Sequence, residues 1–169
     1  MSLGVNGHRV FNSNVKGVAA VAKIRQHMPQ VVCTLARKLN GNVVILEKHG
    51  DRIVPCWLNL EPADKKSCGL TEPFKGMISY LWERAYGCQV TKKGSQITYR
   101  MNQVPDREIT VYYDDKVKRW ESRLRIKGEV CRLDHIWVET TGAMSRPAYI
   151  RLVGRAIRGN HPVTEEIRG

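Results

Sequence analysis

One amphipathic stretch, Thr71–Gly87, constrains the fold more than any other part of the chain. Its apolar residues recur every three or four positions, the spacing of one helix face; they are Phe74, Met77, Ile78, Leu81, Trp82 and Ala85. Thr71 can cap the first turn, Pro73 suits the first helical position, and Gly87 can take the left-handed conformation that ends a helix. The pattern predicts one long helix over residues 71–87.

Most of the remaining chain has the two-residue period of β-strands. Apolar or alternating segments are bounded by turn-forming pairs such as Asn40-Gly41 and Lys93-Gly94. About eight strands are expected, over residues 31–37, 43–46, 53–60, 95–102, 108–113, 118–127, 129–139 and 147–158. Because Pro55 cannot donate to a ladder, it predicts an edge or a bulge in the third strand. The expected fold class is α+β: a mainly antiparallel sheet, open or curled into a half-barrel, packed by the long helix.

Charged and apolar residues alternate in the late strands, which predicts their two faces. The strand at 118–127 is expected to bury Trp120, Ser122, Leu124 and Ile126, and to present Arg119, Glu121, Arg123, Arg125 and Lys127 outward. The next strand is expected to bury Cys131, Leu133 and Trp137, and the last to bury Ile150 and Leu152 while exposing Arg151 and Arg155. A basic stripe on the outside of the sheet follows from this alternation.

The charge balance is the strongest global clue to function. The chain has 28 basic and 16 acidic residues, a net charge of +12. No acidic residue occurs before Glu47, whereas six basic residues do: Arg9, Lys16, Lys23, Arg25, Arg37 and Lys38. Such a balance favours an anionic partner, which can be nucleic acid, an acidic protein surface or an anionic membrane. It is also compatible with a charge that serves solubility alone.

The sequence divides into an arm and one domain. Residues 1–28 form a basic, acid-free N-terminal arm, and residues 29–169 suit a single α+β domain with a short polar C-terminal tail. The arm can dock on a partner, serve as a targeting presequence, or lie on the domain as a surface helix. No apolar run approaches the roughly 20 residues that a transmembrane helix needs.

Cysteine and histidine usage gives the expected compartment. The five cysteines are scattered and odd in number, and neither they nor the five histidines have zinc-site spacing. We therefore expect no disulfide framework, no metal and no cofactor, and an intracellular, reducing location in the cytoplasm, the cytoskeleton or the mitochondrion.

Several short blocks resemble one family. They are Asn40-Gly-Asn-Val-Val-Ile-Leu46, Val54-Pro-Cys-Trp-Leu58, Leu70-Thr-Glu-Pro73 and Leu81-Trp-Glu-Arg-Ala-Tyr-Gly87, with the late segments Arg132–Ile136 and Tyr149–Gly154. Together they are similar to the family catalogued as domain of unknown function 4833. The resemblance covers roughly residues 31–167 and leaves the arm outside. It implies a shared fold and no activity, because the family has none assigned.

Motifs for catalysis are missing from the sequence. It contains no phosphate loop, dinucleotide fingerprint, Gly-x-Ser-x-Gly or His-Glu-x-x-His. The best polar grouping is made of Glu72, Glu83, Arg84, Tyr86, Asp134 and His135. A helix would hold Glu72 and Glu83 about 16 Å apart, too far for direct cooperation. An uncharacterised enzyme with a site near Glu83 is the weakest of the three functions considered.

The leading hypothesis is a non-catalytic structural or accessory subunit that docks on an anionic scaffold. The scaffold would belong to a large ribosome-type or microtubule-type assembly, so the partners would be other subunits, with tubulin or rRNA among them. The alternative is an RNA-binding module that uses strand 118–127, with Tyr112, Trp120 and Tyr149 as stacking surfaces. The expected contact residues are Arg9, Lys16, Lys23, Arg25, Arg119, Arg123, Arg125, Lys127, Arg151 and Arg155.

Overall fold

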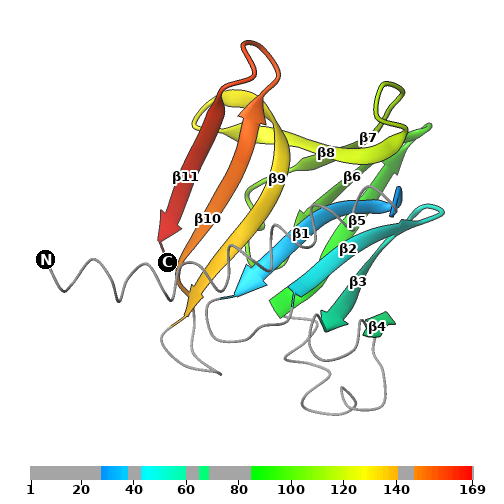
Figure 1. Ribbon diagram of the computed structural model, residues 1–169, viewed down its shortest axis with the longest axis horizontal. Helices are drawn as coiled ribbons and strands as arrows, with labels where there is room; N and C mark the ends of the chain where they lie inside the picture. Colours follow the sequence, from blue (N-terminus) through cyan, green and yellow to red (C-terminus); the bar gives the residue numbers. More distant parts are fainter. Residues whose placement is uncertain (1–27, 38–42, 60–64, 69–84, 141–146, 169) are drawn as a thin grey trace, which may run out of the picture.

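Strands account for nearly all of the residues that the structure describes. The computed structural model describes residues 28–37, 43–59, 65–68, 85–140 and 147–168. Its strands are β1 (Val31–Arg37), β2 (Val43–His49), β3 (Arg52–Asn59), β4 (Lys65–Cys68), β5 (Cys88–Lys93), β6 (Gln96–Met101), β7 (Ile109–Asp114), β8 (Arg119–Ile126), β9 (Glu129–Thr140), β10 (Pro147–Ala156) and β11 (Pro162–Arg168). They form one sheet (Figure 1).

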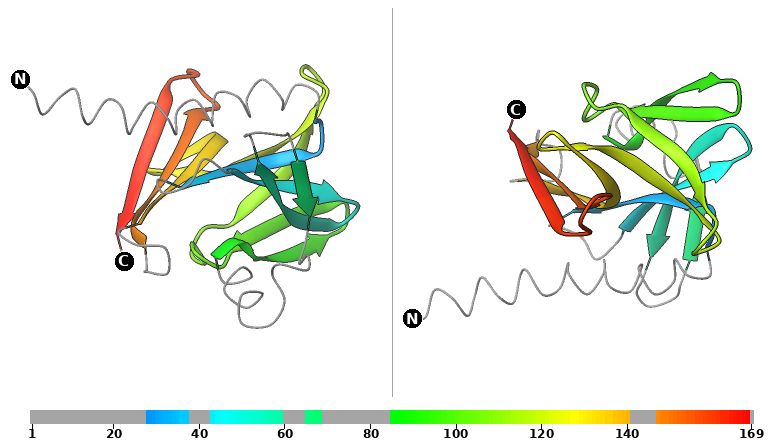
Figure 2. Two further views of the ribbon diagram at one scale, coloured as in Figure 1. Left: turned by 60° about the horizontal axis from the view of Figure 1, so that its bottom comes forward. Right: turned by 90° about the horizontal axis from the view of Figure 1, so that it is seen from above.

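The sheet curls until its two edges nearly meet, giving a barrel-like shape (Figure 2). Its order is β4-β3-β2-β1-β9-β8-β7-β6-β5, with β10 and β11 branching from β9. All pairs are antiparallel except β1 with β9. The edges touch where the Cys88 thiol donates to the Ile53 carbonyl at 3.8 Å and Lys92 pairs with Asp51 at 2.7 Å. A nearly closed sheet leaves few unpaired edge groups.

The α+β prediction is therefore wrong, because the described residues are almost entirely strand. Within them the sheet has eleven strands rather than about eight. The unexpected strands β4, β5 and β11 are short or polar, so they lack an apolar two-residue period and form because a neighbouring strand supplies the hydrogen-bond ladder. Local helical periodicity at 71–87 could not reveal this pairing.

The predicted helix itself falls mostly outside the described residues. Positions 71–84 belong to the part that the structure does not describe, whereas Ala85 and Tyr86 are helical. Gly87 does not take the positive φ expected of a helix-ending glycine, and the chain runs directly into β5. Its carbonyl accepts a hydrogen bond from the Asn102 amide at 2.9 Å, which fixes the start of β5 beside the end of β6.

Alternation correctly predicted much of the core. Ile97, Tyr99 and Met101 of β6 are buried, as are Leu124 and Ile126 of β8 and Ile150 and Leu152 of β10. They belong to one hydrophobic cluster inside the curled sheet. A second cluster lies on the opposite face of β1–β3 and contains Val31, Val43, Ile45, Val54 and Cys56. Strands buried on both faces have continuous apolar sequences, as Val43–Leu46 does.

Pro55 lies at an edge, as a proline within a strand predicts. It pairs with Leu46 of β2 on one side. On the other side β4 pairs only with residues 56–59, so Pro55 lies beyond the end of that ladder. The missing proline N–H therefore removes no hydrogen bond between β3 and β4.

A bulge at Asp134 changes the phase of β9. Leu133 pairs with Gly154 and His135 pairs with Val153, so Asp134 is an extra residue. Cys131 and Leu133 face the core before the bulge, and Ile136 and Val138 face it afterwards. The prediction that Trp137 shares a face with Cys131 and Leu133 is wrong for this reason. Uninterrupted alternation was assumed, and one inserted residue moves every later side chain to the opposite face.

An ion pair joins one rim of the sheet to β11. The Arg107 guanidinium binds the Glu165 carboxylate with two hydrogen bonds, one of them at 3.1 Å. The backbone N–H of Lys127 also donates to Glu165, at 2.8 Å. Lys127 and Gly128 both have positive φ, 49° and 80°, which is the geometry of a type I′ hairpin turn. Glu165 thereby fastens the β6–β7 connection and the β8–β9 turn to β11.

A buried hydroxyl pair spans the interior. The side-chain oxygens of Tyr99 on β6 and Ser122 on β8 lie 2.9 Å apart, and both residues are buried. Burial raises the pKa of the Tyr99 hydroxyl well above its ordinary value, so the group stays neutral. The Tyr99 hydroxyl therefore gives the buried Ser122 hydroxyl a hydrogen-bond partner.

The two hydroxyls should contribute to stability as a pair, so that the two single replacements together cost more free energy of unfolding than the double replacement does. We expect Tyr99→Phe to lower the free energy of unfolding by about 1–3 kcal/mol, because Ser122 loses its buried partner. The Tyr99→Phe/Ser122→Ala double variant should lose less than the sum of the two single losses. Urea unfolding of the four proteins measures this coupling, and strictly additive losses would contradict it.

The Glu165 pair predicts a stability that depends on pH. The Arg107 hydrogen bond is the largest cause that lowers the pKa of Glu165 from its ordinary 4.5. A lowered folded-state pKa stabilises the fold above the unfolded value, and this stabilisation disappears as pH falls through the folded value. The difference in unfolding free energy between wild type and Glu165→Gln should be constant above about pH 5 and shrink below about pH 4.5.

Thermal or urea unfolding across this pH range checks the prediction. Glu129→Gln is a matched control, because its carboxylate pairs with His161 at the surface, where an ion pair contributes little. If Glu165→Gln had the same free energy of unfolding as the wild type at every pH, the ion pair between Arg107 and Glu165 would contribute nothing to stability.

Candidate polyanion-binding surface

Three arginines lie side by side on neighbouring strands. Arg123 of β8 pairs directly with Arg132 of β9, which pairs directly with Arg155 of β10. Adjacent strands are about 4.8 Å apart, so the three side chains leave one face of the sheet within a span of roughly 10 Å. We call Arg123, Arg132 and Arg155 the arginine row. Arg123 and Arg155 are exposed and Arg132 is half-buried.

The backbone at Gly154 permits this arrangement. A Cβ at Gly154 would lie 2.5 Å from the Arg132 carbonyl oxygen and 2.9 Å from Ile126 Cδ1, closer than real side chains come. Glycine therefore lets β10 approach β9 beside the Asp134 bulge. Pairing of β8 with β9 ends at Arg123 and Arg132, and β9 continues with β1 from Ile136. The row thus lies at the point where β9 exchanges one neighbour for another.

The row keeps its charge without acidic compensation. Like charges directly opposite each other destabilise a sheet. Within the described part of the chain, no carboxylate forms an ion pair with any of the three. Arg123 lies over the Tyr112 ring with its guanidinium carbon 3.8 Å from the centroid, and Arg155 donates to the Asn160 carbonyl at 3.0 Å. These contacts orient the two cations without neutralising them.

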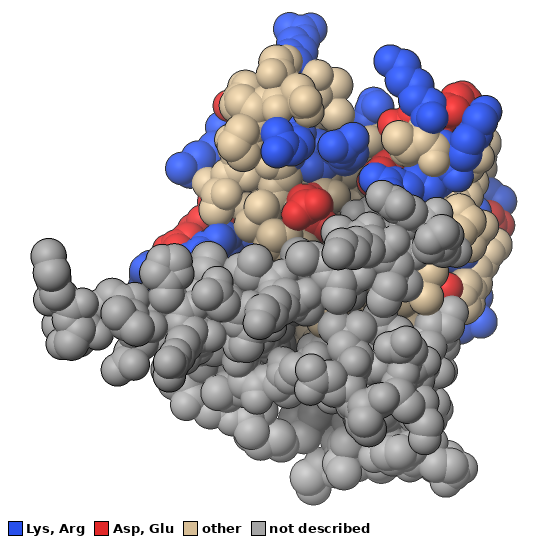
Figure 3. Space-filling model, in the orientation of Figure 1, with Lys and Arg blue, Asp and Glu red and all other residues tan. Residues whose placement is uncertain are grey.

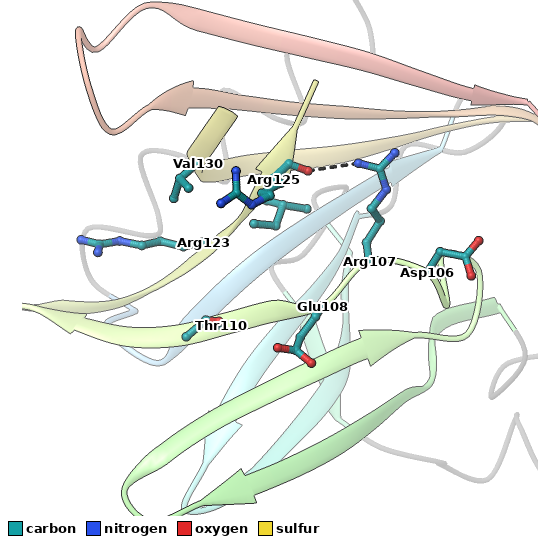
Figure 4. Close-up of a pocket in the computed structure, with 8 residues that line it drawn as sticks. Asp106, Arg107, Glu108, Thr110, Arg123, Arg125 and Val130 are labelled. Atoms are coloured by element: carbon teal, nitrogen blue, oxygen red, sulfur yellow. Dashed lines mark hydrogen bonds between the residues drawn. The ribbon is translucent and has the colours of Figure 1, made fainter. Parts of the chain in front are cut away.

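A shallow hollow adjoins the row. It has a volume of about 430 Å³ and is lined by Asp106, Arg107, Glu108, Thr110, Arg123, Leu124, Arg125 and Val130. Figure 4 shows Arg123 and Arg125 at its wall and Arg107 reaching to the Arg125 carbonyl, a hydrogen bond of 3.1 Å. Arg125 is exposed and donates to the Gly128 carbonyl at 3.0 Å. The lining carries both signs of charge, because Asp106 and Glu108 contribute carboxylates beside the arginines.

The positive charge is visible on one face. In Figure 3, blue side chains lie over the part of this face that is not grey, where β8 to β11 lie, with red side chains among them. Acidic side chains nearby are held by basic partners. Glu121 accepts from Arg119 at 2.5 Å, and Glu166 accepts from Arg151 at 2.9 Å. Among the described arginines of β8, β9 and β10, those without an ion pair are therefore the row and Arg125.

The structure divides the predicted contact residues into groups. Arg123, Arg125 and Arg155 come together, whereas Arg119 and Arg151 are in ion pairs with Glu121 and Glu166. Lys127 is exposed in the hairpin turn. Arg9, Lys16, Lys23 and Arg25 lie outside the described residues. Glu121 is only 1% exposed, although the sequence places it among outward charges.

Sequence reasoning missed Arg132, the central member. It lies between Cys131 and Leu133, which were correctly expected to face inward, so the same alternation placed Arg132 outward. The missing information was register, since only strand pairing shows that Arg123, Arg132 and Arg155 are neighbours. Two positions that alternation places outward on consecutive strands are the signal that could have suggested it.

The expected stacking aromatics already have cations on their rings. Arg123 covers Tyr112, and the Lys48 ammonium is 4.2 Å from the Trp120 ring centroid. Arg151 and Arg168 lie 5.3 and 5.4 Å from the Tyr149 centroid. Burial raises the pKa of the Tyr112 hydroxyl more than Arg123 lowers it, so this ring stays neutral beneath its cation. These rings hold basic side chains in place instead of offering open faces to bases.

The polar grouping considered for catalysis does not assemble. Tyr86 is buried in the core cluster. His135 pairs with Val153 of β10, and its side chain lies on the outer face, opposite to that of Ile136. Its ring nitrogen Nδ1 lies 2.7 Å from Asp134 Oδ2. Glu72, Glu83 and Arg84 lie outside the described residues. Tyr86 and His135 are therefore on opposite faces of the sheet and cannot serve one reacting group.

Metal-ligating side chains do come together on β2 and β3. The side-chain ligand atoms of Glu47, His49 and Cys56 all lie within 4.8 Å of one another. Cys56 is disulfide-bonded, whereas Cys33, Cys88 and Cys131 are not. Spacing along the sequence predicted neither a metal site nor a disulfide framework, because it does not show that a hairpin brings Glu47, His49 and Cys56 together.

No helix in the described segments is long and apolar enough to cross a bilayer.

Removing the central arginine should stabilise the fold. Arg132→Gln relieves repulsion from Arg123 and Arg155, so we expect its free energy of unfolding to rise by about 0.2–1 kcal/mol at low salt. The gain should shrink as salt screens the three charges. Urea unfolding at two salt concentrations measures it. A loss of stability at low salt would show that Arg132 has a stabilising role that outweighs the repulsion.

Sequence comparison gives the chain a family and no activity. The profile of the family described as a domain of unknown function (DUF4833) matches residues 71–166, which is more than half of the chain. The match includes β5 to β10, and with them the whole arginine row. No curated protein and no solved structure matches the chain. The chain belongs to the family described as domain of unknown function DUF4833.

Proposed function

We propose that this protein is a non-catalytic accessory subunit that docks through the arginine row on an anionic scaffold of a larger assembly. The observation that carries the proposal is the register of Arg123, Arg132 and Arg155 on adjacent strands. Three like charges in line raise the free energy of the fold. An anionic partner removes that repulsion when it binds, so the free protein is prepared for such a partner.

The geometry favours anionic oxygens as the ligand. A guanidinium presents a planar fork of N–H donors, which fits phosphate and carboxylate in a bidentate manner. Arg123 and Arg155 are exposed, and contacts within the protein hold both of them. Little side-chain freedom is lost when they bind, and affinity rises accordingly. The row and the adjoining Arg125 offer four cations to one surface.

Two scaffolds with this chemistry are ribosomal RNA and the acidic surface of tubulin. Strand β8, part of the RNA-binding alternative, contributes Arg123 and Arg125 to the surface. Cations on Tyr112, Trp120 and Tyr149 argue against recognition by base stacking. An RNA partner would therefore be bound through its phosphates, and the protein would not recognise its base sequence. The basic arm, residues 1–28, adds further positive charge to either mode of docking.

Salt dependence of binding tests the proposal. The full chain should bind a short single-stranded RNA, and the logarithm of affinity should fall linearly with the logarithm of salt concentration. Arg123→Gln/Arg155→Gln should weaken binding at every RNA sequence tested and reduce the salt slope by about 1 for each lost phosphate contact. Fluorescence anisotropy at several salt concentrations measures both quantities.

Controls separate the row from net charge and RNA from acidic protein. Arg52→Gln/Lys93→Gln removes the same charge from β3 and β5 and should leave the slope nearly unchanged, since both residues lie away from the row. A poly-glutamate peptide of equal charge replaces RNA in a parallel titration and shows which scaffold is preferred. If the row variant and the control variant bind alike, docking through the arginine row is wrong.

A further inference from the structure

The cluster on β2 and β3 follows from strand geometry. Glu47 and His49 are two residues apart on β2, so their side chains leave the same face. Cys56 belongs to the neighbouring strand β3 and to the hydrophobic cluster on that face. The three ligand atoms lie within 4.8 Å of one another. This places one carboxylate, one imidazole and one sulfur around a common point.

The separation of the first two groups is compatible with one shared metal ion. Glu47 Oε2 and His49 Nε2 lie 3.4 Å apart, at the long end of the range for a hydrogen bond. Zinc binds nitrogen and oxygen at about 2.0–2.1 Å with tetrahedral angles. Two such ligands on one ion are therefore separated by about 3.4 Å, which is the observed distance.

Two of the three ligands are buried, and the third is exposed to solvent. Glu47 and Cys56 are buried, 6% and 0% exposed, whereas the His49 side chain is 46% exposed. The inner ligands are thus shielded from water, and the imidazole side provides access for an ion. A tetrahedral ion held by three protein ligands keeps its fourth position for water or for a group of another molecule.

The oxidation state of Cys56 determines whether its sulfur can bind a metal ion. Cys56 is disulfide-bonded, and a disulfide sulfur lacks the thiolate charge that binds zinc. A dithiol reductant supplies two electrons and two protons, so that the S–S bond breaks, two thiols form and the reductant becomes a disulfide. When the Cys56 sulfur binds the ion, the thiol proton is released to solvent.

We propose that Glu47, His49 and Cys56 form a zinc site that becomes competent when the disulfide of Cys56 is reduced. The mixed carboxylate, imidazole and thiolate ligands suit a tetrahedral divalent ion of intermediate softness, which is Zn²⁺. The site is independent of the arginine row, because β2 and β3 are separated from β8–β10 by β1 in the sheet order. Oxidation would release the ion, and reduction would restore its site.

Metal titration of the full chain tests the proposal. The protein reduced with a dithiol, then freed of excess reductant under argon, should bind one Zn²⁺ per chain by calorimetry. Co²⁺ used as a probe should give the near-ultraviolet absorption of thiolate-to-cobalt charge transfer. The oxidised protein should bind at least about 100-fold more weakly, beyond the 10- to 100-fold that loss of an outer-shell partner causes.

Variants distinguish this site from other histidines and thiols. His49→Ala changes an exposed residue and should lower zinc affinity by at least about 100-fold without loss of the fold. Cys56→Ser should abolish the cobalt–thiolate absorption. His161→Ala is the matched control, because His161 also pairs with a carboxylate, at 2.9 Å from Glu129, but belongs to no group of three ligand atoms among the described residues. The control should bind zinc like the wild type.

Three results would overturn the inference. One is failure of the reduced wild type to bind zinc. Another is equal affinity in wild type and His49→Ala, which would place the ion on other residues. The third is equal affinity in the oxidised and reduced proteins, which would remove the dependence on the Cys56 disulfide. Arg123→Gln/Arg155→Gln should retain zinc binding, so failure of the docking proposal leaves this test intact.

Discussion

The pairing of β9 with three different neighbours holds the sheet together. This strand pairs with β8 as far as Arg132, with β1 from Ile136, and with β10 along nearly its whole length. The bulge at Asp134 separates the first two partners and turns Ile136 and Val138 toward the core. Without it, uniform alternation would direct those two side chains outward and leave Trp137 inside. Closure of the sheet, the filling of its core and the position of Arg132 all depend on this one inserted residue.

Sequence patterns predicted individual strands far better than the architecture. Strands with apolar alternation, such as β6 and β8, were located together with their buried residues, because burial on one face selects that pattern. Strand β5 has no such pattern, since nearly all its residues are exposed, and it forms by pairing with β6 and by the Lys92–Asp51 contact at the closing edge. Pairing between distant segments is invisible to a local period. The α+β prediction was wrong because it gave one helical period more weight than such pairing.

The candidate surface could be predicted in part for the same reason. Alternation alone identified Arg123, Arg125 and Arg155 as outward cations, and the structure confirms their exposure. It could not show which arginines were already neutralised, because the carboxylates of Glu121 and Glu166 reach Arg119 and Arg151 only in the folded chain. Nor could it show that Arg132 lies between Arg123 and Arg155. Composition predicted a positive protein, and strand register determines where that charge remains unneutralised.

The arginine row explains why a rigid sheet suits docking on a polyanion. Arg123 and Arg155 are fixed by the Tyr112 ring and the Asn160 carbonyl, and their backbones belong to hydrogen-bonded ladders. A flexible basic segment would lose conformational entropy on binding, whereas these side chains lose little. The repulsion among them is a cost that the core of Leu124, Ile126 and Leu133 directly beneath offsets. Fold stability and the readiness of this surface for an anion are therefore opposed, and the well-packed core beneath it allows the three charges to persist.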